Sequence, residues 1–471
     1  MKTTLGDVFH FTFVGLLLIL LGACGGGGGS PAPMSTSTAM TPSTYMIGGT
    51  VTGLTGSGLV LQNNAGNDLA VSAAGAFTFT DSLTNGAAYA VTVKTQPSSP
   101  AQNCVVNGSS GTVAGANVSV TVFCSTAGRF AYAANAGDNT ISVYSIDSTS
   151  GALTAVGTPV STGMSPYAIA ARPDGRYVYV VNQISNNVSV FAVDATSGAL
   201  TSIPGSPFAA GIDPQALTFD PSGAYLYVAN NGSDNLSAYE VDAGTGALAP
   251  LSTATYATGT GPSAVVASNG ESISSEGGFV FVANNGGSSN ISVFAITAGT
   301  GALTPVVGSP FAAGGNPHSL VLTPFGPWDY GAVFLYTANF DGTGSTISGF
   351  SVDPDTGALT ALSGSPFAEP VSNYIGIDLT GAYLYVTTGA DVAGYSIDAS
   401  GLLTALTGFP VASGANAYSV TVDPSNQFLY VGNSGSANIS GYKLNAANGE
   451  LTAIPGSPFT AGSQPDFIAI L

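Results

Sequence analysis

Charged side chains are scarce in this chain, and basic ones are the scarcest. Only 7% of its 471 residues are charged, with six Lys or Arg against 25 Asp or Glu, so the formal net charge is -19. A protein that binds nucleic acid needs a basic patch to neutralise phosphates, so we expect no nucleic-acid partner. An anionic lipid surface also repels so acidic a protein, unless an anchor or a bound cation holds it there.

Histidine and cysteine are rare as well, with two and three copies in the whole chain. His318 is the only histidine beyond the N-terminal apolar segment, and no cysteine lies near it in the sequence. A transition-metal site needs several such ligands, so we expect no metal and no other cofactor. The sequence also has no calcium-loop spacing, no phosphate loop, and no nucleophile elbow with matching Asp and His partners.

The N-terminus carries an apolar run, Phe11–Leu21, which is too short to span a bilayer comfortably. It leads into Leu21-Gly-Ala-Cys24 and then five glycines. These residues resemble the lipobox of bacterial lipoproteins, which implies that residues 1–23 are a signal peptide and that Cys24 is lipidated. The alternative is an ordinary secretory signal with a chance cysteine. The lipobox implies a lipid-anchored protein of the bacterial cell envelope, and Gly25 favours the outer membrane because it is not the Asp that retains many lipoproteins at the inner membrane.

Two segments precede the main part of the chain. Residues 24–44 are rich in Gly, Ser, Thr and Pro and cannot bury a core, so they are predicted to be a flexible tether. Residues 45–126 show short alternating runs separated by turn residues, which predicts a small β-sandwich. This segment resembles the Ig-like or carboxypeptidase-regulatory-like modules that follow lipobox signals. We interpret it as a spacer.

Cys104 and Cys124 lie in this small domain. With Cys24 lipidated, they form an even pair in an exported protein, so we predict a disulfide between them. The alternative is two free buried thiols. A bond that closes a loop of this size stabilises the fold by about 3 kcal/mol in the chain-entropy model.

An aromatic strand that usually ends in Asn recurs along the rest of the chain. Its seven copies are Tyr132-Ala-Ala-Asn135, Tyr179-Val-Val-Asn182, Tyr227-Val-Ala-Asn230, Phe281-Val-Ala-Asn284, Tyr336-Thr-Ala-Asn339, Tyr385-Val-Thr-Thr388 and Tyr430-Val-Gly-Asn433. Spacings of roughly 45–55 residues are typical of propellers rather than of helical solenoids. The pattern therefore predicts an all-β protein with a seven-bladed β-propeller at residues 128–471.

One repeat shows how a blade is built. Its four predicted strands are Arg176–Asn182, Val188–Val193, Leu200–Ile203 and Pro214–Asp220, separated by turn residues. The last residues, Gln464–Leu471, match the fourth strand of this repeat. We expect them to pair with the first aromatic strand and close the ring, because closure removes exposed strand edges.

The fourth strands are the predicted inner strands of the propeller, and the residue after their usual Pro forms a ring at one mouth of the channel. The ring consists of Tyr167, Gln215, Ser263, His318, Tyr374, Tyr418 and Asp466. Such a mixture of aromatic and polar side chains is typical of a small-molecule pocket, so we predict that these residues bind a ligand. The alternative is a polar lining around a water-filled channel.

His318 is the candidate catalytic residue of this ring. It is the only side chain beyond the N-terminal segment whose ordinary pKa suits acid–base work near neutral pH. The alternative is a hydrogen-bonded structural histidine.

The tyrosine-led strands, the Asp-x-x-Thr/Ser-Gly-Ala-Leu-Thr turns and the Pro-led inner strands resemble YVTN-type propellers. They resemble more closely the bacterial lactonase family of seven-bladed propellers, named for 6-phosphogluconolactonase, over about residues 128–471. The resemblance implies an enzyme that opens a sugar lactone without a metal. Pro317-His318 matches the Pro-His element that the family carries on its inner strands.

The chain departs from that family in its cations. A phosphosugar needs Arg or Lys to bind the phosphate. The cations of the propeller are only Arg129, Arg172, Arg176 and Lys443. Arg172 ends an inner strand and Arg176 follows the next turn, so we expect both on the face opposite the ring.

Two functions remain open at this point. The first is an envelope-anchored module that binds a small molecule or an envelope component and is held at the membrane by its lipid. The second is a lactonase-like hydrolase that opens an uncharged or weakly charged lactone.

Overall fold

The computed structural model describes residues 43–471, apart from 55, 99–101, 108–109, 127–129, 269–277, 324–332, 341–343 and 370–373. The predicted signal peptide, Cys24 and nearly all of the tether lie outside the described residues, so their assignment stays a prediction. Within the described part, no helix is long and apolar enough to cross a membrane.

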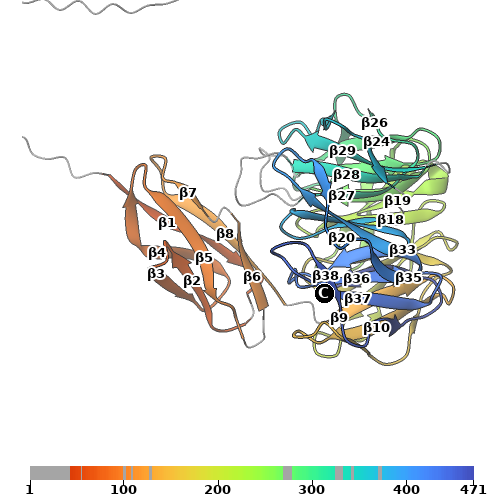
Figure 1. Cartoon of the computed structure of the whole chain (residues 1–471), viewed down its shortest axis with the longest axis horizontal. Helices are drawn as coiled ribbons and strands as arrows, with labels where there is room; N and C mark the ends of the chain where they lie inside the picture. Colours follow the sequence, from red (N-terminus) through yellow and green to blue (C-terminus); the bar gives the residue numbers. More distant parts are fainter. Residues whose placement is uncertain are drawn as a thin grey trace, which may run out of the picture. The chain divides into compact units, whose positions relative to one another are not determined.

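The N-terminal domain is built from two four-stranded sheets (Figure 1). One has the order β4-β1-β8-β6, with β4 (Gly75–Thr84), β1 (Thr44–Thr52), β8 (Val118–Thr126) and β6 (Gln102–Asn107). The other has the order β3-β2-β5-β7, with β3 (Asn67–Val71), β2 (Leu59–Asn63), β5 (Ala88–Thr95) and β7 (Ser110–Thr112). One buried cluster takes side chains from both sheets, among them Ile47, Phe79, Leu61 and Val91. The resemblance of this domain to Ig-like modules stays a prediction.

The predicted disulfide is confirmed. Cys104 on β6 lies directly opposite Cys124 on β8 in the antiparallel pair, and their sulfurs are 2.04 Å apart. Both side chains are buried in the core of the small domain.

The rest of the described chain forms the seven blades of a β-propeller, each an antiparallel sheet whose first-named strand here is the innermost. Blade 1 consists of β40 (Pro465–Ile470), β9 (Phe130–Asn135), β10 (Thr140–Ile146) and β11 (Leu153–Ala155). Blade 2 consists of β13 (Pro166–Ala171), β14 (Tyr177–Asn182), β15 (Asn187–Val193) and β16 (Leu200–Ser202). Blade 3 consists of β18 (Pro214–Phe219), β19 (Tyr225–Asn230), β20 (Asn235–Val241) and β21 (Leu248–Ala257). Blades 4 and 5 are β22 (Pro262–Ala267), β23 (Phe279–Asn284), β24 (Asn290–Ile296), β25 (Leu303–Pro305); and β27 (Pro317–Leu322), β28 (Val333–Phe340), β29 (Ser345–Val352), β30 (Leu359–Ala361). Blades 6 and 7 are β32 (Ile375–Ile377), β33 (Tyr383–Ile397), β34 (Leu403–Ala405); and β35 (Val411–Val422), β36 (Phe428–Asn433), β37 (Asn438–Leu444), β38 (Leu451–Ala453).

The observed strands differ from the predicted ones in detail. A short strand that the sequence did not indicate, β17 (Phe208–Ala209), also pairs with β15. Blades 6 and 7 join into one sheet because β33 and β35 are long and pair with each other. In blade 6, Thr388 stands where the other aromatic strands end in Asn, and the strand continues through it.

The ring closes as predicted. The C-terminal strand β40 is antiparallel to β9, with Phe467 opposite Ala134, and the C-terminus lies beside β9 in Figure 1. Leu471 and Phe130 exchange two backbone hydrogen bonds, of 2.9 and 3.2 Å. Each inner strand contacts the next one round the channel, and β40 contacts β13.

The recurring aromatic strands hold the blades together. In six of the seven copies the tyrosine hydroxyl donates to the carbonyl of a turn glycine in the next blade; the pairs are Tyr132–Gly198, Tyr179–Gly246, Tyr227–Gly301, Tyr336–Gly401, Tyr385–Gly449 and Tyr430–Gly151. The last pair joins blade 7 to blade 1. Gly151 has a φ of 75°, and a Cβ there would lie 2.4 Å from the ring of Phe428, so this turn requires glycine.

Candidate functional site

Six of the seven predicted ring residues sit at irregularities in the inner strands, and Tyr374 lies just before β32. In the pairing of β13 with β14, Pro166 faces Asn182 and Ala168 faces Val181, so Tyr167 has no partner. The register shifts in the same way at Gln215, Ser263, His318 and Asp466. A β-bulge redirects the side chain of its extra residue, which explains why these positions can turn away from the regular sheet.

Three tyrosines of the ring meet across the channel. The hydroxyl oxygens of Tyr167 and Tyr374 are 2.8 Å apart, Tyr374 donates to Tyr418 at 3.1 Å, and the hydroxyls of Tyr167 and Tyr418 are also hydrogen-bonded. The ring of Phe467 packs against all three, with centroid distances of 5.6, 5.0 and 5.9 Å. Tyr167 belongs to blade 2, Tyr374 to blade 6 and Tyr418 to blade 7, so the contact spans the channel mouth.

Asp466 lies on β40, and its strand is flanked by the strands of Tyr418 and Tyr167. Its side chain is only 8% exposed. Burial raises the pKa of the Asp466 carboxyl to about 6, and a hydrogen bond with the Ser434 side chain opposes this rise. Burial is the largest cause of the raised pKa values of Tyr167 and Tyr418. The negative charge of the Asp466 carboxylate is a smaller cause that raises both values further. The phenols therefore stay protonated at neutral pH and can donate hydrogen bonds, while Asp466 is ionised above pH 6.

We call Tyr167, Tyr374, Tyr418 and Asp466 the tyrosine mouth. The four residues come from blades 2, 6, 7 and 1, which are consecutive around the ring.

His318 lies on β27 in blade 5, and none of its contacts among the described residues reaches the tyrosine mouth. Its Nδ1 is 3.2 Å from the side-chain amide nitrogen of Asn285, and its ring packs against Phe340 with a centroid distance of 6.4 Å. Burial lowers the pKa of His318, and a hydrogen bond with the backbone of Phe340 opposes this effect. The imidazole is therefore neutral at pH 7 and already engaged by its neighbours.

The remaining two ring residues also pair locally. Gln215 donates to the carboxylate of Asp213 at 3.3 Å, and Ser263 donates to the carbonyl of Pro317 at 2.9 Å. The structure thus brings four of the seven predicted residues together and leaves Gln215, Ser263 and His318 with partners of their own. Ligand binding by the ring stays a prediction.

Sequence reasoning missed three residues that shape this region. Phe467 packs on the tyrosines, Asn285 contacts His318, and Ser434 contacts Asp466. Asn285 and Ser434 each follow the terminal Asn of an aromatic strand. The position directly after this Asn could therefore have marked both residues as neighbours of the ring. Phe467 could not be found in this way, because its sequence position resembles that of any other apolar residue of an inner strand.

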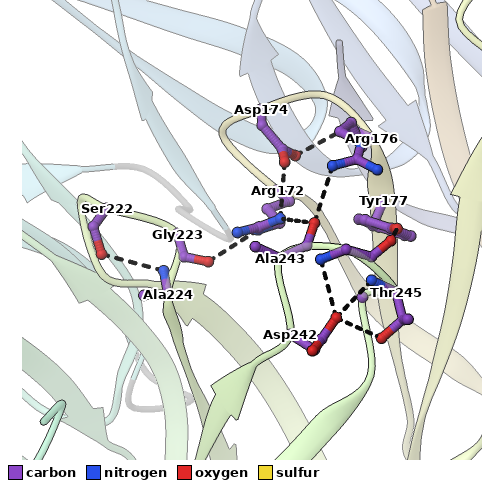
Figure 2. A network of polar contacts seen from close by, with 12 residues as sticks. Arg172, Asp174, Arg176, Tyr177, Ser222, Gly223, Ala224, Asp242, Ala243 and Thr245 are labelled. Atoms are coloured by element: carbon purple, nitrogen blue, oxygen red, sulfur yellow. Dashed lines mark hydrogen bonds and ion pairs between the residues drawn. The ribbon is translucent and has the colours of Figure 1, made fainter.

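The cations at the other end of β13 are occupied (Figure 2). Arg172 is 7% exposed; it donates to the carbonyls of Gly223 and Ala243 at 3.0 and 3.3 Å and pairs with Asp174 at 2.8 Å. Arg176 donates to the carbonyl of Ala243 at 3.0 Å. Both arginines therefore join blade 2 to blade 3 rather than offer a phosphate site.

Of the two other propeller cations, one is described, and it lies away from the mouth. Lys443 is exposed on β37, which pairs with the second strand of blade 7 and not with its inner strand. Arg129 lies outside the described residues.

The fold and the mouth define a closed seven-bladed propeller with three hydrogen-bonded phenols and a buried carboxyl whose charge acts on two of them. The family model described as lactonase, seven-bladed β-propeller, matches residues 95–208, 206–267 and 328–469, and the chain belongs to this family. The unmatched segment 268–327 holds His318.

Several solved structures share the fold. A putative 6-phosphogluconolactonase from Bacteroides fragilis is 20% identical with a TM-score of 0.61, and covers 73% of this chain and 97% of its own. One from Bacteroides uniformis is 18% identical with a TM-score of 0.60, at 73% and 99% coverage. The periplasmic gluconolactonase of Pseudomonas aeruginosa is 19% identical with a TM-score of 0.56, at 73% and 98% coverage. No curated protein matches the chain.

Proposed function

We propose that this protein hydrolyses an uncharged or weakly charged lactone at the tyrosine mouth. The observation that carries the proposal is the buried carboxyl of Asp466, whose pKa is raised to about 6 and whose charge acts on Tyr167 and Tyr418, two of the three hydrogen-bonded phenols. Perturbed titratable groups of this kind gather at catalytic sites. Membership of the lactonase family supports the same reaction class.

The arrangement suits the opening of a cyclic ester by water. The Asp466 carboxylate takes a proton from water as the water oxygen bonds to the lactone carbonyl carbon, and the carbonyl oxygen becomes an oxyanion. Phenol hydroxyls can donate hydrogen bonds to that oxyanion. When the tetrahedral intermediate collapses, the ring C–O bond breaks and the ring oxygen receives the proton held by Asp466. The product is the open hydroxy acid.

The charges of the protein favour a substrate without a phosphate. Arg172 and Arg176 are occupied at the other end of the blades, and no described contact brings a cation to the mouth. A phosphosugar would therefore meet a carboxylate without a compensating positive charge. The net charge of -19 would repel it further.

Asp466 takes the role for which the sequence favoured His318. A general base needs access to the attacking water and a pKa near the working pH. His318 is engaged by Asn285 and by the backbone of Phe340, and burial lowers its pKa, whereas burial raises the pKa of Asp466 to about 6. The family's Pro-His element makes His318 the control that the experiment has to include.

A panel of lactones tests the reaction. Wild-type protein should hydrolyse glucono-δ-lactone or a simple alkyl δ-lactone faster than 6-phosphogluconolactone. Asp466→Asn should lower kcat/KM by about 10²- to 10⁴-fold, the usual contribution of a general base, and His318→Ala by less than about tenfold. Ser351→Ala, a change on the third strand of blade 5 whose hydroxyl contacts only the Thr360 carbonyl among the described residues, serves as the control.

Two results would contradict the proposal. In the first, wild-type protein binds uncharged lactones but hydrolyses none of them, which would favour an envelope-anchored binding module. The other is an inactive His318→Ala protein beside an active Asp466→Asn protein.

The proposed location is the bacterial cell envelope, with Cys24 as the lipid anchor. The lipobox resemblance supports it, and so does the Cys104–Cys124 disulfide, since disulfides persist in oxidising compartments. Mass spectrometry of the native N-terminus should find a diacylated or triacylated Cys24. An unmodified chain cut at another position would refute the anchor.

A further inference from the structure

Three large apolar side chains are exposed at the end of the propeller that carries the tyrosine mouth. Met164 is 54% exposed, and Ile184 and Ile212 are each 61% exposed. Met164 and Ile212 precede the inner strands β13 and β18, and Ile184 follows the second strand of blade 2. We call these three residues the apolar rim. Single apolar residues are common on protein surfaces, whereas a contiguous group of them points to a binding surface.

Backbone contacts make the apolar rim contiguous. The Ile184 amide donates to the Met164 carbonyl at 3.3 Å, in the turn that follows β14. At the other end of this turn, the Asn186 side chain accepts from the amide of Asp213, the residue after Ile212, at 2.8 Å. The apolar rim therefore runs from blade 2 to blade 3 without a break.

The repeat does not require apolar side chains at these places. The backbone hydrogen bond that joins Ile184 to Met164 has equivalents in four other blades, namely Gly137 to Ser463, Gly232 to Ile212, Gly286 to Thr260 and Gly435 to Ala415. Glycine thus stands where blade 2 has Ile184, and blades 1, 4 and 7 have a small residue where blades 2 and 3 have Met164 and Ile212. The exposure of the apolar rim also excludes a role in the core.

The charges around the apolar rim favour an uncharged occupant. Asp213 follows Ile212 directly, and Asp138 and Asp234 are exposed on the neighbouring turns of blades 1 and 3. A second copy of this chain, with its net charge of -19, would bring the same carboxylates against these, and an anionic lipid surface would be repelled as well. An alkyl chain carries no charge and gains from leaving water.

We propose that the apolar rim binds an alkyl chain of the substrate whose lactone ring lies at the tyrosine mouth. Met164 lies three residues before Tyr167, so their Cα atoms are at most about 11 Å apart, and one small molecule can contact both features. The substrate class is then an alkyl-substituted lactone rather than a sugar lactone, whose hydroxyls would lose hydration against apolar side chains. This inference rests on the hydrolysis proposed for the mouth and adds what the substrate carries besides its ring.

δ-Hexalactone and δ-decalactone test for the chain. They share the lactone ring and the ester bond, and they differ only in an alkyl chain that is a methyl group in one and a pentyl group in the other. Each added methylene that is partly buried on the apolar rim should raise kcat/KM by about twofold, so wild-type protein should prefer δ-decalactone by about tenfold. Equal kcat/KM values for the two lactones would overturn the inference and leave the proposed function intact.

Substitutions test whether the preference arises at the apolar rim. The triple variant Met164→Thr, Ile184→Gly, Ile212→Thr introduces residue types that other blades have at these positions, and its preference for δ-decalactone should fall below about threefold. Val307→Thr is the matched control, because it removes an apolar side chain that is 93% exposed in the turn after β25, and it should keep the wild-type ratio. A wild-type ratio in the triple variant would overturn the inference.

The lactam analogues of the two lactones separate this inference from the reaction, because they keep the ring and the chain but resist hydrolysis. Calorimetry on the mature full-length protein should find the longer lactam bound about tenfold more tightly by wild-type protein and by Val307→Thr, but not by the triple variant. If no lactone is hydrolysed, the proposed function fails and this binding ratio still decides about the apolar rim.

Two further results would count against an alkyl chain. Equal binding of the two lactams by wild-type protein would overturn the inference whether or not the triple variant folds. The same holds if phosphatidylcholine vesicles bind wild-type protein and not the triple variant while both lactams bind equally, because the apolar rim would then contact a lipid surface.

Discussion

Strand β13 carries very different polar groups at its two ends. At the end, Arg172 is buried with partners on the next blade, and its contacts are carbonyls and a carboxylate in fixed positions. At the start, Tyr167 reaches across the channel to tyrosines of blades 6 and 7, beside a carboxyl whose pKa burial raises to about 6. The first arrangement stabilises the fold. The second keeps a carboxyl group whose pKa is shifted by burial, which is typical of a functional site.

The largest effect is expected from deletion of residues 464–471. These residues supply β40, which completes blade 1 and carries Asp466. Their removal leaves the backbone groups of β9 without partners at the channel and opens the ring. The truncated protein should aggregate or lose its cooperative thermal transition. Asp466→Asn, which keeps the strand, is the control; a truncated protein that melts cooperatively at the wild-type temperature would show that the ring closes in another way.

Arg172→Met should weaken the fold and spare the reaction. It leaves the Gly223 carbonyl and the Asp174 carboxylate without their buried donor and the Ala243 carbonyl with Arg176 alone, so the free energy of unfolding should fall by about 2–4 kcal/mol. Denaturant titration measures this fall, and kcat per folded molecule should stay at the wild-type value. The exposed Arg176→Met should cost much less, and equal losses in the two variants would contradict the structural role of burial here.

Asp466→Asn should do the reverse, lowering activity and raising stability in a way that depends on pH. Because the folded protein holds the Asp466 proton more firmly than the unfolded chain does, the wild-type free energy of unfolding should fall as pH rises from about 4 to about 6, and then level off. The shift from 3.8 to about 6 corresponds to a loss of the order of 3 kcal/mol above that window. Asn does not titrate, so the stability gain of the variant should be larger at pH 8 than at pH 4. A gain that is the same at both pH values would contradict the raised pKa.

The smallest effect is expected for the hydroxyls between blades. Tyr430→Phe removes the bond to Gly151 that joins blade 7 to blade 1, and Tyr179→Phe removes the equivalent bond inside the array. Each should cost about 1 kcal/mol, the net value of one hydrogen bond. Phe281 already stands at this position in blade 4 without a hydroxyl. Chemical denaturation measures the free energy of unfolding of both variants. A much larger decrease for Tyr430→Phe than for Tyr179→Phe would mean that the junction of blades 7 and 1 is the least stable part of the ring.

The sequence was sufficient for features that repeat or that depend on local order. Seven aromatic strands and a C-terminal copy of the inner strand predicted seven blades and their closure, and two cysteines predicted the disulfide. The position of Arg172 and Arg176 at the end of the inner strand away from the ring also followed from the sequence, whereas their hydrogen-bond partners on blade 3 did not.

The arrangement of the site did not follow from the sequence. Whether Tyr167 meets Tyr374 depends on the width of the channel and on bulges that redirect single side chains. The pKa of Asp466 depends on how neighbouring blades bury it. The partners of His318 come from two different blades: Asn285 follows β23 in blade 4, and Phe340 ends β28 in blade 5, so the repeat pattern did not identify them.

The dependence of kcat/KM on pH for an uncharged lactone, corrected for spontaneous hydrolysis, tests the central claim most directly. The reaction needs the ionised carboxylate of Asp466, so the rate should rise through about pH 6 and then level off. His318→Ala should keep the same midpoint, and Asp466→Asn should lose both the rate and the transition. A midpoint that persists in Asp466→Asn and disappears in His318→Ala would contradict the account and return the catalytic role to the histidine.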